Sequence, residues 1–403
     1  MQQNKSKRYH SLDIVRGVAA VSVVLSHLIN YIPISSTNFF DSLCVEFVDL
    51  FMLIFRGSAR LSAHPGVIVF IVLSGFCIHL PIANAYHRIK KHGFWSEYAV
   101  RRLIRIAPVY WAACLLGLFA LLSWRYSSSV ILPHWLSASA SIDILDVIRK
   151  FGMIDPVLLS NPISLGNPAL RTVATEIWLY ALYPLVLAVL IYSSWCMRVI
   201  VLCLLYVATV AMTLLPMVPS GWAYESVPRF LVWWMIGVYA ADWFKKHPTW
   251  GASMKGWMIT ILLAVVMIVL NSISDFRGAY LITVPVLALF SASLLISLLS
   301  SEFLGMIQGG VIVRAFSAIG LRSYSLYAVH MPVLGLYYLV INKYNAPYYG
   351  APQGSAFVPL LTIALVTELF FRYIELPSHS AAKRLGRLFS KSVPDSTRLD
   401  RNT

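Results

Sequence analysis

The sequence places ionisable side chains inside segments that are otherwise apolar. The segment SLDIVRGVAAVSVVLSHL holds Asp13, Arg16 and His27. Arg16 and His27 are eleven positions apart, so in a helix they lie on one face, separated by about 16 Å along the axis. A boundary arginine that extends to phospholipid and a buried structural histidine are the alternatives. Because the two share a face, a site that binds an anion and moves a proton is favoured.

Two further arginines stand at the start of another apolar segment, EYAVRRLIRIAPVYW. Arg102 and Arg105 are three positions apart and therefore neighbours on one helix face. Paired guanidinium groups suit phosphate recognition, because each presents a planar fork of donors. A simple anchor on the positively charged side of a membrane is the alternative.

Carboxylates and a second histidine also fall in apolar segments. Glu176, in LRTVATEIWLYALYPL, is predicted to lie at the same depth in the membrane as His27. There its carboxylate would orient the imidazole or hold an acceptor hydroxyl. The alternative is a structural ion pair with Arg171 or Arg229. Ser325, Tyr327 and His330 form either part of a site or a polar helix seam. Arg372 and Glu375 are predicted to form an ion pair near the end of the last span, which Pro377 terminates.

The amino-acid composition indicates which kind of fold positions these side chains. The chain has 403 residues, of which 59% are hydrophobic and only 12% are charged. A typical soluble domain carries roughly twice that charged fraction. The composition therefore predicts an all-α membrane protein, because a soluble fold could not bury so much apolar surface.

Segments long enough to cross a bilayer core of about 30 Å recur along the chain. We predict ten spans, at 12–32, 65–82, 105–123, 170–192, 198–216, 228–243, 257–271, 280–300, 323–341 and 357–374. Part of the sixth span, 228–243, could lie at the membrane interface because of Trp233, Trp234 and Asp242. The segment Leu43–Phe55 is expected to be a short interfacial or re-entrant helix. The long connection between Trp124 and Arg171 is either a closing element over an acceptor or a plain connector.

The distribution of Lys and Arg predicts the orientation. With the N-terminus in the cytoplasm, 21 of the basic residues fall on the inner side and 9 on the outer side. Both termini are therefore predicted to be cytoplasmic. We expect residues 1–380 to form one transmembrane domain, followed at 381–403 by a short basic tail.

Several classes of function are excluded or disfavoured. The net charge of +15 comes from short clusters between apolar segments, which is typical of contacts with membrane lipids and not with nucleic acid. The five cysteines show no metal-ligand or disulfide spacing, and we predict no metal site and no bound cofactor. Motifs of ATP-driven and Ser-His-Asp chemistry are absent from the sequence.

Six segments in this order resemble the acyltransferase 3 family of bacterial membrane O-acyltransferases. They are LDIVRGVAAVSVVLSH, FIVLSGF, RRLIRIAPVYW, TEIWLYALYPL, SYSLYAVHMPV and IELP. The resemblance implies transfer of an acyl group, usually acetyl from acetyl-CoA as co-substrate, to a sugar hydroxyl of a surface or exported glycan such as O-antigen or exopolysaccharide. It implies a location in the bacterial inner membrane.

By this resemblance His27 and Arg16 are the catalytic pair, and Arg102 and Arg105 bind the donor. Glu176, which we group with the catalytic residues, matches a recurrent polar position, as do Tyr327, His330 and Glu375; Asp13 completes the candidate site. The imidazole of His27 would either act as a base or carry the acyl group itself. A secondary transporter or exporter of a glycan or lipid-linked sugar, and a non-catalytic sensor or scaffold, are the competing classes.

Overall fold

The fold is entirely helical within the part of the chain that the computed structural model describes. That part comprises residues 9–31, 39–59, 64–83, 85–91, 93–126, 143–158, 163–213, 215, 218, 226–273, 280–306, 310–345 and 355–392. The predicted all-α class is confirmed for these residues.

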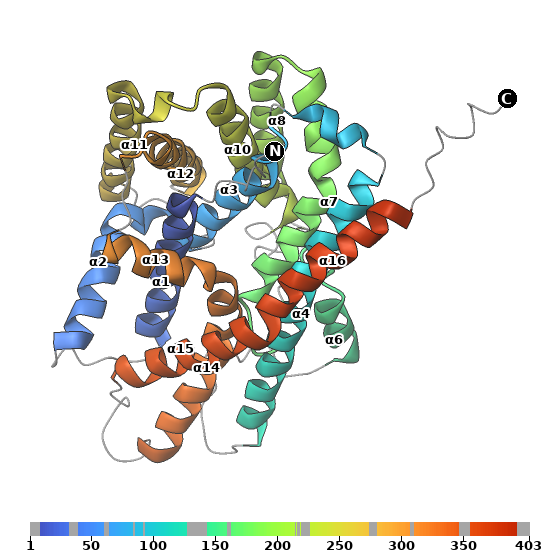
Figure 1. Ribbon diagram of the computed structural model, residues 1–403. Helices are drawn as coiled ribbons and strands as arrows, with labels where there is room; N and C mark the ends of the chain where they lie inside the picture. The colour runs from blue at the N-terminus through green and yellow to red at the C-terminus, as the bar shows by residue number, and fades with distance from the viewer. Residues whose placement is uncertain are drawn as a thin grey trace.

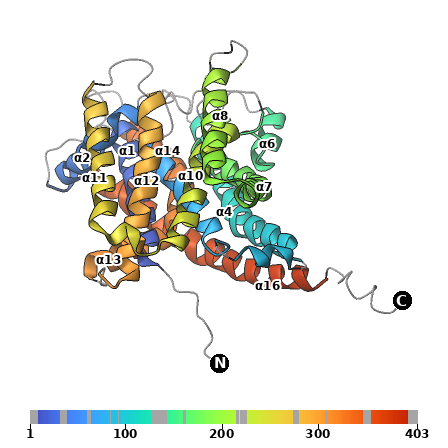
Figure 2. The same cartoon turned by 90° about the horizontal axis from the view of Figure 1, so that it is seen from above.

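The helices are arranged as a bundle with two elements lying across one end (Figures 1 and 2). Their bounds are α1 His10–Tyr31, α2 Phe39–Ala59, α3 Pro65–His79, α4 Phe94–Arg125, α6 Ile144–Phe151, α7 Leu170–Tyr192, α8 Trp195–Thr213, α10 Val227–Lys246, α11 Met254–Ile273, α12 Tyr280–Phe303, α13 Val311–Leu321, α14 Ser323–Asn345, α15 Phe357–Phe370 and α16 Leu376–Ser392. Short 3-10 turns lie at Tyr86–Lys90 (η1) and Trp250–Ala252 (η2). In Figure 2, α13 and α16 lie across the end of the bundle at which α1 begins.

Seven helices in the described ranges are long and apolar enough to cross a bilayer. They are located at His10–Asn30, Phe94–Arg125, Leu170–Tyr192, Trp195–Thr213, Leu281–Phe303, Ser323–Ile341 and Phe357–Leu388. Each corresponds to a predicted span. Two further predicted spans correspond to the shorter apolar helices Pro65–His79 and Met254–Leu270, so the total of ten remains a prediction.

Large apolar side chains point outward from several of these helices. Leu204 on α8 is 64% exposed, Leu262 on α11 is 60% exposed, and Leu365 on α15 is 59% exposed. Exposing so much apolar surface to water is unfavourable, and lipid tails would cover it in a membrane. The arrangement agrees with the composition.

Helix α10 lies inside the bundle, and most of its side chains are buried. Trp233, Trp234 and Asp242 are all at most 1% exposed. Neighbouring protein therefore covers all three, and their placement at the membrane interface stays a prediction. Asp242 accepts hydrogen bonds from Tyr86 at 2.7 Å and Lys246 at 2.9 Å, and it pairs with Arg198 at 3.1 Å.

The close approach of α3 and α10 depends on two glycines, each of which faces the backbone of the other helix. A methyl group added at Gly75 would overlap the carbonyl of Trp234, and one added at Gly237 would overlap the carbonyl of Val72. Small residues permit such crossings in membrane bundles, where dispersion contacts drive association. The same reciprocal arrangement joins α1 to α13 through Gly17 and Gly320.

Replacing Gly237 with Ala should destabilise the protein by about 1–3 kcal/mol, because the added methyl group forces two packed backbones apart. The thermal midpoint of the detergent-solubilised protein measures the effect. Gly310→Ala is the control, because among the described residues no atom outside the local backbone lies within 4 Å of its added methyl group. Equal midpoints for Gly237→Ala and the wild type would contradict the packing account.

The C-terminal helix continues past the point where we expected it to stop. A π-helical turn at Phe371–Glu375 joins α15 to α16, so Pro377 falls in the first turn of α16 and does not end the helix. A proline is tolerated there because its missing N–H lies where the hydrogen-bond register already changes. The predicted division at residue 380 lies within α16, which packs along α4 (Figure 1). Residues 393–403 of the predicted tail lie outside the described part.

Two other expectations need correction. Arg372 pairs with Glu368 and not with Glu375, because its guanidinium lies one helical turn from Glu368, at 2.5 Å. The helix expected at Leu43–Phe55 extends over the 21 residues of α2.

The connection between α4 and α7 has structure of its own. It contains α6, whose Lys150 donates to the carbonyl of Ile163 at 2.7 Å, and it supplies Asp155, which forms a buried ion pair with Arg171 at 2.7 Å. Residues 127–142 and 159–162 of this connection lie outside the described part.

Candidate active site

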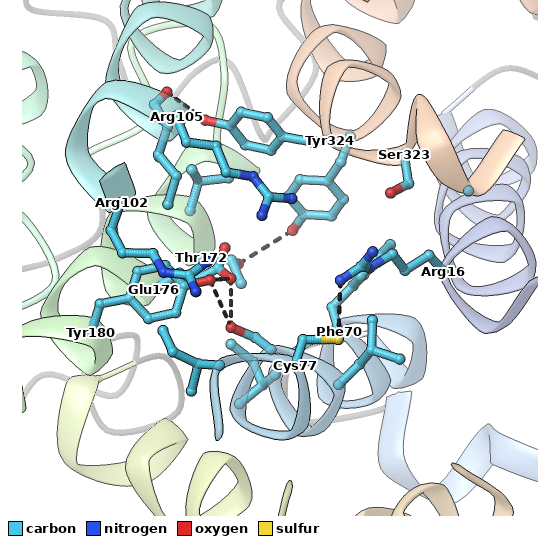
Figure 3. Close-up of a pocket in the computed structure, with 18 of the residues that line it drawn as sticks. Arg16, Phe70, Cys77, Arg102, Arg105, Thr172, Glu176, Tyr180, Ser323 and Tyr324 are labelled. Carbon is cyan, nitrogen blue, oxygen red and sulfur yellow. Dashed lines mark hydrogen bonds between the residues drawn. The ribbon is translucent and has the colours of Figure 1, made fainter. Parts of the chain in front are cut away.

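A cavity of about 170 Å³ lies between α1, α3, α4, α7, the junction of α13 and α14, and α16. Its polar lining comes from residues far apart in the sequence, which converge in Figure 3. They are Arg16, Ser74, Cys77, Arg102, Arg105, Thr172, Glu176, Tyr180, Ser323, Tyr324, Tyr327, Glu375 and His379. We call this cavity the arginine pocket.

Three guanidinium groups enter the arginine pocket from opposite walls (Figure 3). Arg16 comes from α1, where its Nη atoms lie 3.1 Å from the sulfur of Cys77 and 3.5 Å from a carboxylate oxygen of Asp13. Arg102 and Arg105 come from α4, and Arg102 lies 5.4 Å from the ring centre of Tyr180. The spacing of Arg102 and Arg105 placed both on one face, as expected.

Hydrogen bonds hold the two carboxylates of this pocket. Glu176 accepts from the hydroxyl of Ser74 at 2.5 Å and from the hydroxyl of Tyr180. Glu375 accepts from the hydroxyl of Ser325 at 2.5 Å and from its backbone N–H at 3.2 Å. With Asp13 beside Arg16, the three guanidinium charges are matched by three nearby carboxylates. The arginine pocket is therefore polar but close to electrically balanced.

A second group of polar residues is formed by histidines. Nε2 of His330 lies 3.1 Å from Nδ1 of His27, and the two rings stack with centres 5.1 Å apart. The ring of His64, the residue that precedes α3, lies 6.2 Å from that of His27. We call these three residues the histidine cluster.

The hydrogen bonds of the histidine cluster define which ring nitrogens carry protons. Nδ1 of His330 lies 2.8 Å from the backbone carbonyl of Tyr327, which can only accept, so this nitrogen carries the proton. In a neutral imidazole the other nitrogen, Nε2, then accepts, and Nδ1 of His27 donates to it. The lone pair of neutral His27 is therefore on Nε2, as a general base requires.

Tyr327 connects the two groups. It lines the arginine pocket, its ring centre lies 5.5 Å from that of His330, and its hydroxyl lies 3.3 Å from that of Thr172. Phe70, also in the pocket lining, packs edge-on against Tyr327 at 5.8 Å. Two packed aromatic rings thus line the arginine pocket, and the backbone carbonyl of one of these residues, Tyr327, holds His330.

The structure divides the predicted site residues between the two groups. Arg16, Arg102, Arg105, Glu176, Tyr327 and Glu375 line the arginine pocket, Asp13 lies beside it, and His27 and His330 are in the histidine cluster. Glu176 does not lie beside His27, because its hydrogen bonds hold it against α3 and its own helix. Its suggested partner Arg171 pairs instead with Asp155.

The sequence predicted no chemical role for His64, Ser74 or Tyr180; Ser74, with Gly75, was expected only to permit a close approach of backbones. Tyr180 stands four positions after Glu176, a spacing that places the two on one helix face and could have identified it. His64 lies outside the predicted spans and had no comparable signal.

The sequence was compared with protein families, curated proteins and solved structures. The family described as an acyltransferase domain (Acyl_transf_3) matches residues 9–371. No curated protein and no solved structure matches the chain. The family match includes every described helix from α1 to α15 and all of the polar residues that meet in the two groups except Glu375 and His379. The chain belongs to the acyltransferase 3 family and is a multi-pass membrane acyltransferase.

Proposed function

We propose that this protein transfers an acyl group, in the simplest case acetyl, from acyl-CoA to a hydroxyl of a sugar in a cell-surface or exported glycan. The observation that supports this most strongly is the meeting of a guanidinium-lined pocket with a histidine base at Tyr327. Such a site combines recognition of an anionic donor with proton removal from an acceptor. The protein would act in the bacterial inner membrane, with both termini in the cytoplasm, as the distribution of basic residues favours.

The donor would enter from the end of the bundle where α13 and α16 lie. Arg102 and Arg105 would bind its phosphate groups, and the pantetheine arm would pass through the arginine pocket toward Tyr327. The thioester would then lie within reach of His27, about three helical turns from Arg16 along α1.

The reaction would require two proton transfers, one to His27 and one from it. Nε2 of His27 would accept the proton of the sugar hydroxyl while the oxygen attacks the thioester carbonyl. A carbon–oxygen bond forms, the carbon–sulfur bond breaks, and the imidazolium returns the proton to the departing thiolate. The hydrogen bond from Nδ1 of His27 to His330 would stabilise the transient positive charge.

A variant of this route passes through an acyl-histidine, in which Nε2 of His27 attacks the thioester directly. Incubation with radiolabelled acetyl-CoA and no acceptor distinguishes the two. Label retained by the wild-type protein and absent from His27→Ala indicates the acyl-histidine route, and unlabelled protein indicates direct transfer.

Replacing Arg102 with Ala should raise the KM for acetyl-CoA by about tenfold or more with a smaller change in kcat, because a charge-assisted contact to phosphate is lost. Initial rates in membrane vesicles at varied acetyl-CoA concentration measure this. Arg125→Ala, at the other end of α4, is the matched control and should leave KM unchanged. An unchanged KM for Arg102→Ala would return this arginine to the role of a membrane anchor.

Mass spectrometry of surface glycans from cells with and without the gene tests the proposed function. We expect an ester-linked acyl group on the glycan only when the gene is present. Glycans that carry identical acyl groups in both strains would contradict the proposal. If the glycan instead accumulates on one side of the membrane without the gene product, the competing class of transporter is favoured.

A further inference from the structure

A second cavity, of about 590 Å³, opens next to the arginine pocket. The ends of α3 and α4, the segment around η1, and α16 form its walls. Ile78, Arg102, Arg105 and His379 line both cavities, so the two are contiguous. We call the second cavity the vestibule.

The vestibule is much more positively charged than the arginine pocket. Beyond Arg102 and Arg105, which it shares with the arginine pocket, its lining contains four basic residues, Arg88, Lys91, Arg101 and Lys383, and one carboxylate, that of Glu97. Glu97 is engaged by Arg101, its neighbour one turn along α4. In the arginine pocket, by contrast, nearby carboxylates match the guanidinium groups. A ligand portion with several negative charges is therefore attracted to the vestibule more strongly than to the pocket behind it.

The two lysines of the vestibule lie on elements other than α4, which carries Arg102 and Arg105. Lys91 follows η1, and Lys383 stands on the exposed side of α16. The ammonium group of neither lysine forms an ion pair or a hydrogen bond within the described part of the chain. Two ammonium groups without a protein counter-charge, facing one cavity, indicate an anionic ligand.

Aromatic side chains add a surface for a planar group. Phe94 and Tyr98 both line the vestibule, and their rings are nearly parallel, with an interplanar angle of 17° and centres 6.5 Å apart. Purine bases stack on such side chains. A cavity that offers both a stacking surface and several basic groups suits a phosphorylated nucleoside.

We propose that the vestibule binds the adenosine 3′-phosphate of the CoA donor, with Lys91 and Lys383 contacting the 3′-phosphate. This rests on the proposed function. Arg102 and Arg105, which line both cavities, would hold the diphosphate at the junction, and the uncharged pantetheine arm would occupy the balanced arginine pocket. The C-terminal helix α16 thereby becomes part of the donor site.

The test compares three acetyl donors, acetyl-CoA, acetyl-dephospho-CoA and acetyl-pantetheine, in the full-length protein in liposomes of neutral lipid. For the wild type we expect the KM for acetyl-CoA to be about tenfold or more below that for acetyl-dephospho-CoA. Lys383→Glu and Lys91→Glu should each raise the KM for acetyl-CoA by a similar factor and remove most of this preference. Rates with acetyl-pantetheine should not change, because it lacks the nucleotide. Adenosine 3′,5′-bisphosphate should compete with acetyl-CoA in the wild type and not in Lys383→Glu.

Arg384→Glu is the matched control, because it reverses a charge on the adjacent exposed position of α16 outside the vestibule lining. Equal KM values of the wild type for acetyl-CoA and acetyl-dephospho-CoA would overturn the assignment, as would slower reaction of Lys383→Glu with acetyl-pantetheine. An effect of Lys383→Glu that appears only in liposomes with anionic lipid would show that the vestibule binds a lipid headgroup instead. Failure of the wild type to transfer acetyl from any of these donors would instead count against the proposed function.

Discussion

His27→Ala should reduce acyl transfer by at least about 10²–10⁴-fold, the usual contribution of a positioned general base. The imidazole is held by His330 at 3.1 Å in the tautomer that leaves the lone pair on Nε2. If the acyl group passes through His27 covalently, the loss should be at least as large. Transfer from radiolabelled acetyl-CoA to envelope glycan, in membranes with equal amounts of inserted protein, measures the effect.

His10→Ala is the control for this prediction, because His10 lies on the same helix and is exposed at the opposite end of α1. Its activity should equal that of the wild type. Transfer at the wild-type rate by well-inserted His27→Ala would remove His27 from the reaction and with it the proposed mechanism.

His330→Leu should lower kcat by about 10- to 100-fold while leaving the KM for acetyl-CoA unchanged. Leucine fills similar volume but cannot accept the proton of Nδ1 of His27, so the preferred tautomer and the stabilisation of the imidazolium are lost. His330→Gln should recover much of this loss, because its side-chain amide oxygen can accept where Nε2 of His330 does.

The rescue distinguishes a positioning role from a purely structural one. His330 is fully buried, and a structural requirement would affect Leu and Gln variants alike. Kinetics are therefore measured together with the thermal midpoint of each solubilised variant. Equal loss of kcat in both variants, or full activity of His330→Leu, would contradict the tautomer account.

The local geometry of single helices could be predicted from the sequence. Residues eleven positions apart on α1, or three apart on α4, must share a face, and Arg102 and Arg105 indeed enter one pocket. The apolar lengths likewise predicted most of the long helices, because a bilayer imposes them.

Contacts between distant helices could not be predicted in this way. His330 contacts His27 although the two are 303 positions apart in the sequence. Nothing in either segment specifies that α14 packs against α1 with these two residues side by side. Glu176 was placed wrongly because its depth was counted from the end of an apolar segment, whereas Ser74 and Tyr180 decide its position. The burial of Trp233 and Trp234 likewise could not be predicted from residue type, because it depends on the glycine crossing that brings α3 against α10.

The central claim is tested most directly by the stoichiometry of the reaction in liposomes that contain the purified protein. Labelled acetyl-CoA is supplied with envelope glycan from cells that lack the gene, and free CoA thiol and labelled glycan ester are measured together. We predict one ester for each CoA released, with both products lost in His27→Ala and retained in His10→Ala. Movement of the glycan into the liposomes without release of CoA, or equal ester formation by His27→Ala, would contradict the account.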